Sequence, residues 1–132
     1  MWNVSRRRIM NILIVDDELG LREILKDIIE LQMDCNVHTA SNGQEALNIV
    51  AKEWIDFVIV DFRMPIMNGF EFINQFSASN PKNCEAQIML LSGFLEEVIP
   101  HLKNFPNVSP RTKPIDPDEI LEFVSQKQEY VV

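Results

Sequence analysis

The chain has 132 residues, with 12 lysines and arginines against 20 aspartates and glutamates, which gives a formal net charge of −8. A chain of this length builds one hydrophobic core, so we expect a single domain and no room for a separate output domain. The acidic balance argues against direct binding of nucleic acid, and no apolar stretch approaches the roughly 20 residues that cross a bilayer, so no membrane insertion is expected.

The terminal residues indicate where the domain begins and ends, and the cysteines indicate the cellular compartment. Residues 1–8 carry three arginines without a signal-peptide cleavage pattern, so we expect a basic N-terminal tail. The domain is expected over residues 9–129 and a C-terminal tail over residues 130–132. Cys35 and Cys84 have no CxxC or Cys/His ligand spacing, which disfavours a disulfide framework and a zinc site. These features favour the reducing cytoplasm.

The first elements alternate between short apolar runs and helical periodicity. Residues 9–15 form a mostly apolar run that is typical of a buried strand. In residues 21–31 the apolar side chains recur at helical spacing among charged ones, which predicts an amphipathic helix. Residues 37–40 then predict a weak second strand.

A second helix and a central strand follow. Residues 45–53 have an apolar helical face, and Ser41 or Asn42 can serve as the N-cap. Residues 57–60 are short, continuous and apolar, which is typical of a parallel strand covered on both faces. This strand ends at Asp61.

The second half continues the alternation less regularly. A third helix is predicted around residues 70–76, between turn signals and the stop at Pro81. Residues 86–91 predict a fourth strand. Residues 94–113 contain three prolines, so we expect a short fourth helix, in which Glu96 and Glu97 belong to a solvated face, and a weak fifth strand.

The last elements complete the pattern. Pro110 lacks a backbone donor and therefore suits only an edge strand. Residues 116–128, with Pro117 near the first turn, predict the terminal helix. Five strands that alternate with helices predict an α/β fold, (βα)5, with a five-stranded parallel sheet and helices on both faces.

Polar residues follow the predicted strands where each strand ends. In such sheets, ligands bind beyond the carboxyl ends of the strands. We therefore expect one edge of the sheet to gather acidic, hydroxyl and ammonium groups: Asp16, Asp17, Asp61, Ser92 and Lys113.

This group has a coherent chemistry. Carboxylates brought close together repel one another unless a hard divalent cation lies between them, and Mg²⁺ is the natural candidate. Asp61 is then a candidate nucleophile that attacks a phosphoryl group and forms an aspartyl phosphate. Lys113 and the metal would balance its charge, and Ser92 would bind a phosphoryl oxygen.

The residues resemble the receiver domains of two-component response regulators, over about residues 9–128. Four motifs carry the resemblance: ILIVDDE at residues 12–18, Val60-Asp61 with MPIMNG at residues 64–69, Leu91-Ser92-Gly93, and Lys113-Pro114. The resemblance implies a doubly wound sheet of flavodoxin-like order 2-1-3-4-5.

The resemblance also implies a role for each matching residue. Asp16 and Asp17 match the acidic pair for Mg²⁺, with Asp17 a direct ligand, and Asp61 matches the phosphoacceptor. The backbone carbonyl of Arg63 matches the third protein ligand of the metal. Ser92 matches the switch hydroxyl and Lys113 the phosphate-contacting lysine. The implied phosphodonor is a sensor histidine kinase or a histidine phosphotransfer protein, and the implied output is a stand-alone phosphorylation switch acting on a protein target.

One departure from the family leaves an alternative open. Receivers carry Tyr or Phe three residues before the conserved lysine as the rotating partner of the switch hydroxyl, and here that position is Pro110. A proline ring cannot swing between an exposed and a buried rotamer. Phe105 is a candidate substitute, and the alternative function is a degenerate receiver that binds proteins without being phosphorylated.

Other interpretations compete with the site. Asp16 and Asp17 also fit helix N-capping, and Asp61 alone fits a turn. A phosphohydrolase of the haloacid-dehalogenase type needs a second acid two residues after the nucleophile, where this chain has Arg63. We therefore expect a phosphoacceptor rather than an enzyme with turnover.

Overall fold

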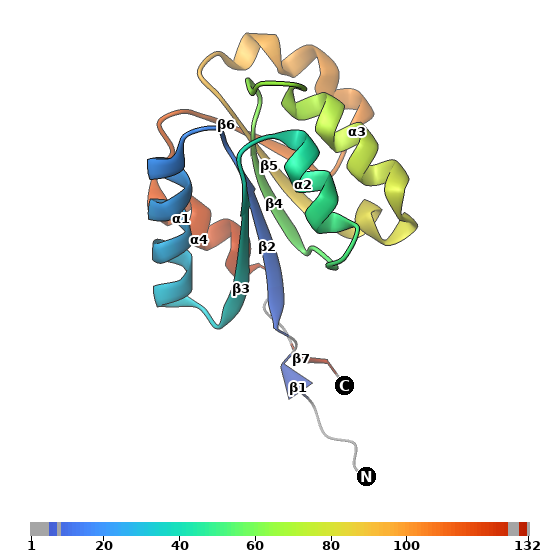
Figure 1. Ribbon diagram of the computed structural model, residues 1–132. Coiled ribbons are helices and arrows are strands. Elements are labelled where there is room, and N and C mark those ends of the chain that lie inside the picture. The colour runs from blue at the N-terminus through green and yellow to red at the C-terminus, as the bar shows by residue number, and fades with distance from the viewer. Residues whose placement is uncertain (1–5, 8, 127–129, 132) are drawn as a thin grey trace.

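The computed structural model describes residues 6–7, 9–126 and 130–131. Its centre is a five-stranded parallel sheet in the order β3-β2-β4-β5-β6 (Figure 1). The strands are β2 (Met10–Val15), β3 (Cys35–Ala40), β4 (Phe57–Asp61), β5 (Gln87–Ser92) and β6 (Val108–Thr112). Counted along the chain, this is the order 2-1-3-4-5, and the predicted fold class is confirmed.

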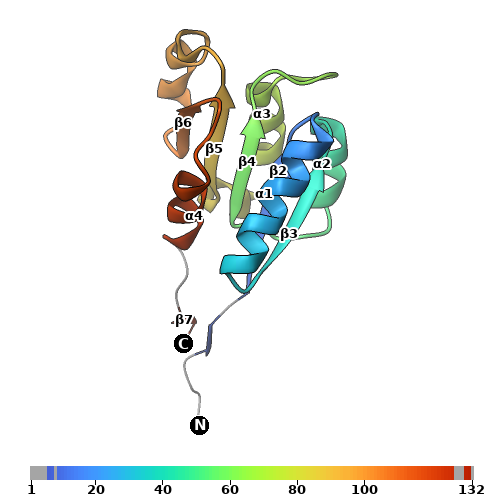
Figure 2. The same cartoon turned by 90° about the vertical axis from the view of Figure 1, so that its left-hand side faces the viewer.

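Helices cover both faces of the sheet. The α-helices are α1 (Leu19–Gln32), α2 (Gly43–Val50), α3 (Gly69–Ser79) and α4 (Pro117–Ser125). Helices α1 and α4 lie on one face, and α2 and α3 lie on the other (Figures 1 and 2). The short 3₁₀ helices are η1 (Pro81–Glu85), η2 (Leu95–Glu97) and η3 (Ile99–Asn104).

The sheet separates two hydrophobic cores, which explains the continuous apolar strands. Side chains alternate between the faces of a strand. In β2, Leu13 and Val15 join the core under α2 and α3, whereas Ile12 and Ile14 join the core under α1 and α4. Because both faces are covered, all four positions are buried and the strand reads as a continuous apolar run.

Helix caps in the sequence place the beginnings of two helices. The Asn42 side chain accepts a hydrogen bond from the backbone N–H of Glu45 at 2.8 Å, which selects Asn42 over Ser41 as the N-cap of α2. Asn68 and Glu71 form a reciprocal capping box at the start of α3. That box fixes the entry of α3 directly after the loop that follows Asp61.

The connection between β5 and β6 differs from the other crossovers. The sequence predicts a short helix here, and the structure contains two 3₁₀ helices, η2 and η3, with Pro100 in the first turn of η3. Strand β6 lies at the edge of the sheet, where Pro110 pairs in register with Leu90. An edge strand tolerates the missing N–H of proline, as predicted.

Two short strands from opposite ends of the described chain lie beyond the end of the sheet that is opposite the carboxyl ends of its strands (Figure 1). Strands β1 (Arg6–Arg7) and β7 (Tyr130–Val131) pair antiparallel. The rest of the predicted N-terminal tail, the end of the predicted terminal helix at residues 127–128 and Val132 lie outside the described residues. Within the described ranges, no helix has the length and apolar character needed to span a membrane.

Candidate functional site

Four parallel strands deliver polar residues to one edge of the sheet, the upper edge in Figure 1. Asp16 and Asp17 follow β2, and Asp61 is the last residue of β4. Ser92 ends β5, where it pairs in register with Thr112, so Lys113 follows immediately on the neighbouring strand. The chain order reverses between β2 and β4, which is where doubly wound sheets bind ligands.

Three carboxylates form a compact acidic group. Carboxylate oxygens of Asp16, Asp17 and Asp61 all lie within 4.8 Å of one another. Asp16 and Asp61 are 2% and 6% exposed, whereas Asp17 is open to solvent. Oxygen ligands at this spacing, with one side open to water, suit a hard divalent cation that keeps several of its waters.

Lys113 supplies a positive charge to this group. Its Nζ donates hydrogen bonds to Oδ2 of Asp61 at 2.9 Å and to Oδ2 of Asp16 at 3.1 Å. Its backbone N–H donates to the carbonyl of Ser92 at 2.9 Å, which ties the start of the loop after β6 to the end of β5. The ammonium therefore lies between two buried carboxylates and offsets part of their repulsion.

The pKa shifts of Asp61 and Lys113 follow from this arrangement. Burial raises the pKa of Asp61, and the charges of Asp16 and Asp17 add to the rise, while the hydrogen bond from Lys113 opposes it. For Lys113, burial opposes the charged form, but the hydrogen bond and charge of Asp61, with those of Asp16, raise its pKa overall. The buried carboxylate is therefore destabilised as an anion unless a second cation joins Lys113.

The capping interpretation of the acidic pair is wrong in the structure. The N-cap of α1 is Glu18, which makes no side-chain capping hydrogen bond. Asp16 instead accepts from the backbone N–H of Glu18 at 2.9 Å through Oδ1 and from Lys113 through Oδ2. Asp16 is thus oriented by the loop before α1 rather than used to cap the helix.

Arg63 lies two residues after Asp61, and its side chain is 74% exposed. Its guanidinium binds Glu97 through two hydrogen bonds, Nε to Oε1 at 3.1 Å and Nη2 to Oε2 at 2.6 Å. Such a fork is the bidentate geometry that arginine makes with carboxylates. The metal-ligand role of the Arg63 carbonyl stays a prediction.

Ser92 makes its hydrogen bonds away from the acidic group. Its Oγ lies 3.0 Å from the Phe94 carbonyl oxygen and 3.1 Å from Oε1 of Glu97, both acceptors for its single O–H proton, and it accepts from the Phe94 N–H at 3.0 Å. The sequence interpretation of Glu97 as part of a solvated face is wrong, since Glu97 joins Ser92 to Arg63. Its spacing from Ser92 follows no helical pattern, so nothing in the sequence indicated the contact.

The loop from β4 to α3 passes close to Asp61, and Gly69 allows that approach. A Cβ atom at Gly69 would lie 2.7 Å from Cδ1 of Leu90 and 3.0 Å from the carbonyl oxygen of Asp61. The N–H of Gly69 donates to the Phe62 carbonyl at 2.8 Å. Glycine lets the loop close at this distance without those contacts, because it has no Cβ atom.

Phe105 belongs to an aromatic cluster under the η2 and η3 helices. Its ring centroid lies 5.1 Å from that of Phe70, which also contacts His101 at 5.1 Å and Phe62 at 5.8 Å. Phe105 is therefore packed against α3. Pro110 lies on β6, at the position where receivers carry a rotating Tyr or Phe. The suggested substitution of Phe105 for that aromatic stays a prediction.

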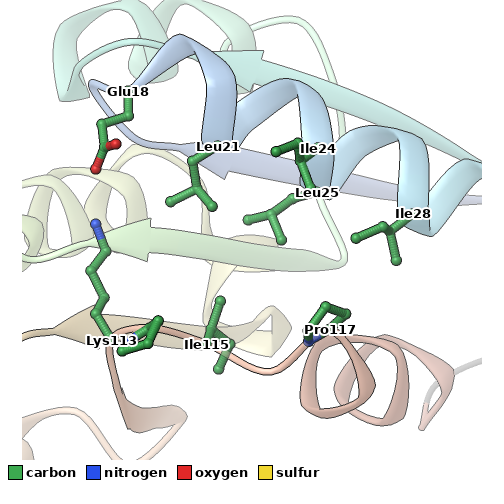
Figure 3. Close-up of a pocket in the computed structure, with 9 residues that line it drawn as sticks. Glu18, Leu21, Ile24, Leu25, Ile28, Lys113, Ile115 and Pro117 are labelled. Atoms are coloured by element: carbon green, nitrogen blue, oxygen red, sulfur yellow. The ribbon is translucent and has the colours of Figure 1, made fainter.

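An apolar groove begins beside the site, between α1 and the segment from β6 to α4 (Figure 3). Its volume is about 430 Å³. Glu18 and Lys113 lie at the end next to the acidic group, and the remainder of the lining is apolar: Leu21, Ile24, Leu25, Ile28, Pro114, Ile115 and Pro117. The groove gives the site an apolar border on its α1 side.

Comparisons with known proteins agree with this geometry. The family model of the response regulator receiver domain matches residues 12–125. Sporulation initiation phosphotransferase F of Bacillus subtilis is 34% identical over 115 residues, which cover 87% of this chain and 90% of that protein. The probable transcriptional regulator ycf27 of Cyanidium caldarium is 35% identical over 74% of this chain but only 36% of its own length.

Solved structures share the fold. The chemotaxis response regulator CheY4 of Vibrio cholerae superposes with a TM-score of 0.79 at 26% identity, covering 90% of this chain and 98% of that one. A two-component transcriptional regulator AraC from Clostridium phytofermentans superposes with a TM-score of 0.73 at 27% identity, covering 90% and 91%.

Proposed function

The chain belongs to the family of response regulator receiver domains, and from this premise we propose that it is a magnesium-dependent phosphorylation switch in two-component signal transduction. Receiver domains are signalling phosphoacceptor domains rather than classical enzymes. One observation carries the proposal: the buried carboxylate of Asp61 is hydrogen-bonded to Lys113 and lies beside two further aspartates.

Asp61 is the proposed phosphoacceptor. A carboxylate oxygen of Asp61 attacks phosphorus, the new O–P bond forms, and the bond from phosphorus to the donor nitrogen breaks. The donor is a phosphohistidine on a sensor histidine kinase or a histidine phosphotransfer protein, and its imidazole leaves. Burial raises the pKa of Asp61, and the hydrogen bond from Lys113 opposes that rise, so Lys113 already offsets part of the charge at the proposed point of attack.

Asp16, Asp17 and Asp61, with the backbone carbonyl of Arg63, are the proposed protein ligands of Mg²⁺. The spacing of the three carboxylates within 4.8 Å fits a hard cation of this kind. When bound, Mg²⁺ supplies positive charge to the transferring phosphoryl oxygens.

Lys113 and Ser92 are the proposed sensors of the phosphoryl group. Lys113 already donates to Asp61, and its ammonium can neutralise the charge that accumulates on the phosphoryl oxygens. Phosphorylation adds almost two negative charges and new acceptor oxygens, and it stabilises whichever conformation lets Ser92 and Lys113 bind them. The switch is a shift between two conformations.

We also propose that the domain acts alone on a protein target. The match to sporulation initiation phosphotransferase F, which covers 90% of that protein, supports this choice. The regulator ycf27 is matched over 36% of its length and represents the other arrangement, a receiver within a longer chain. Recognition by a target would then use the surface of the domain itself.

Two alternatives are disfavoured. A degenerate receiver would require no phosphoacceptor chemistry, yet Asp16, Asp61 and Lys113 form a connected group. A phosphohydrolase would require an acid two residues after Asp61, and Arg63 at that position directs its guanidinium to Glu97.

The mass of the intact protein tests the proposal. Incubation with acetyl phosphate and Mg²⁺ is expected to add one phosphoryl group, and EDTA or the substitution Asp61→Asn is expected to prevent the addition. Asp56→Asn is a matched control, because Asp56 is also a buried aspartate and directly precedes β4, at the end of the strand away from the site. An unmodified wild-type mass with both acetyl phosphate and a phosphorylated histidine donor would contradict the proposal.

A further inference from the structure

The hydroxyl of Ser92 is already engaged in the structure. Its oxygen lies 3.1 Å from Oε1 of Glu97 and 3.0 Å from the carbonyl oxygen of Phe94, both of which are acceptors. A serine has one O–H proton to donate. A phosphoryl oxygen on Asp61 must therefore compete with Glu97 and Phe94 for that proton.

Glu97 is fixed in this position from its other side. Arg63 binds both carboxylate oxygens of Glu97, and the Glu97 side chain is only 21% exposed. The hydrogen bond from Arg63 is also the main reason that the pKa of Glu97 lies below its ordinary value, while burial opposes that shift. Glu97 is therefore held by the guanidinium of Arg63 with Oε1 in position to accept from Ser92.

The three side chains link two loops that flank the acidic group. Arg63 belongs to the loop after β4, whereas Ser92 and Glu97 belong to the end of β5 and to η2. We infer that Glu97, fixed by Arg63, is a positioning residue that holds the Ser92 hydroxyl in the unphosphorylated conformation and must release it before Ser92 binds the phosphoryl group. This inference rests on the proposed function of Asp61 and Ser92.

Release of Ser92 has a structural route to the rest of the domain. Glu97 is the last residue of η2, and the next residue, Val98, is fully buried against the core. Leu95, Leu102 and Phe105 pack against the same core on either side. A change at Glu97 therefore acts on the packing of the η2 and η3 helices without needing a rotating aromatic at Pro110.

The affinity for beryllofluoride, a phosphoryl analogue, tests the inference in the presence of Mg²⁺. Glu97→Ala is expected to bind the analogue roughly two- to fivefold more tightly than wild type, the range for loss of one charged interaction near the surface. The affinity of Glu97→Gln for the analogue is expected to lie between those of wild type and Glu97→Ala, because the glutamine amide oxygen can still accept from Ser92.

Two controls separate positioning from simple charge repulsion. Glu96→Gln removes the same charge from the neighbouring exposed position and is expected to change the affinity less than Glu97→Ala. In a Ser92→Ala background, Glu97→Ala is expected to lose its effect, because the side chain through which it acts is gone. Equal effects of Glu96→Gln and Glu97→Ala, or an undiminished effect without Ser92, would overturn the inference.

Hydrogen exchange without any phosphoryl analogue provides an independent readout. Glu97→Ala is expected to accelerate exchange of the Phe94 and Val98 amides, and Glu96→Gln to leave them unchanged. Faster exchange in Glu97→Ala supports the positioning role even if wild type fails to bind beryllofluoride, a failure that would count against the proposed function alone. Unchanged exchange together with unchanged affinity would refute the role of Glu97.

Discussion

The ammonium of Lys113 lies 2.9 Å from a carboxylate oxygen of Asp61, although 52 residues separate them in the chain. The same Nζ reaches Asp16 at 3.1 Å. Both carboxylates are almost completely buried, whereas the Lys113 side chain is 24% exposed. Lys113 is therefore the partner on which two buried charges depend.

Removing the ammonium should destabilise the metal-free domain. Lys113→Ala leaves Asp16 and Asp61 without their shared cation, so we expect the free energy of unfolding to fall by about 2 kcal/mol. Urea unfolding at pH 7 in EDTA measures this change. Lys103→Ala, at an exposed position in η3, is the control and should change stability little. Equal stability of the two variants would show that Lys113 does not support the buried carboxylates.

The pH dependence of stability should reveal the raised pKa of Asp61. A carboxyl group whose pKa is higher in the folded state contributes stability below its ordinary pKa and loses that contribution as pH rises through the raised value. Asp61→Asn removes this loss, so the variant should be more stable than wild type at pH 7 without metal. The difference should shrink as pH falls toward about 4.

Urea midpoints of wild type and Asp61→Asn, measured from pH 7 to pH 4 in EDTA, check the sign of this stability difference. The same measurements on Asp118→Asn, an exposed aspartate in α4, supply the control. If Asp61→Asn is less stable than wild type at pH 7, the hydrogen bond from Lys113 outweighs the burial of the carboxylate.

Magnesium should stabilise the domain through the acidic group. At a concentration about 100 times its dissociation constant, a ligand bound only by the folded state adds about 2.7 kcal/mol. We expect this gain for wild type and a large loss of it for Asp17→Ala. Because Asp17 is exposed, its removal should leave the metal-free stability unchanged or slightly higher, by relief of carboxylate repulsion.

Urea midpoints across a Mg²⁺ titration measure both effects. Asp27→Ala, at an exposed position on α1, should retain the full response to Mg²⁺. An Asp17→Ala variant that responds like wild type would remove Asp17 from the metal site, and a clearly weaker metal-free variant would contradict the repulsion argument.

Two glycines should respond to alanine in opposite ways. A Cβ at Gly69 would approach Cδ1 of Leu90 to 2.7 Å and the Asp61 carbonyl to 3.0 Å, so Gly69→Ala should destabilise the domain by about 2 kcal/mol. At Gly20 in α1 an added Cβ would have no atom within 4 Å apart from its own stretch of helix, and alanine should stabilise the helix by up to about 1 kcal/mol. Thermal unfolding midpoints of Gly69→Ala and Gly20→Ala test both expectations. Similar midpoints for the two variants would exclude crowding at Gly69.

The fold could be predicted from the sequence because each element carries its own pattern. The apolar runs of β2 and β4 are continuous because helices cover both faces of the sheet. Asn42 caps α2 and Asn68 caps α3 through side chains that bond within three residues of the cap. Such local interactions are readable without knowledge of the rest of the chain.

The gathering of the acidic residues and Lys113 was also predictable. Parallel strands all present their carboxyl ends at one edge, so residues that follow β2, β4 and β6 must meet there. The sequence could not show that Lys113 contacts Asp16 across 97 residues, or that Asp16 serves a loop instead of capping α1. Those details depend on side-chain directions within a few ångströms.

The segment between β5 and β6 shows most clearly what only the tertiary structure decided. Its prolines indicated irregularity, but the 3₁₀ geometry of η2 and η3, with Val98 buried between them, depends on packing against α3 and β6. The same packing brings Glu97 to Ser92 and Arg63. Secondary structure and strand ends follow from local periodicity and backbone hydrogen bonding, whereas a contact among three side chains from separate loops exists only when the whole core positions them.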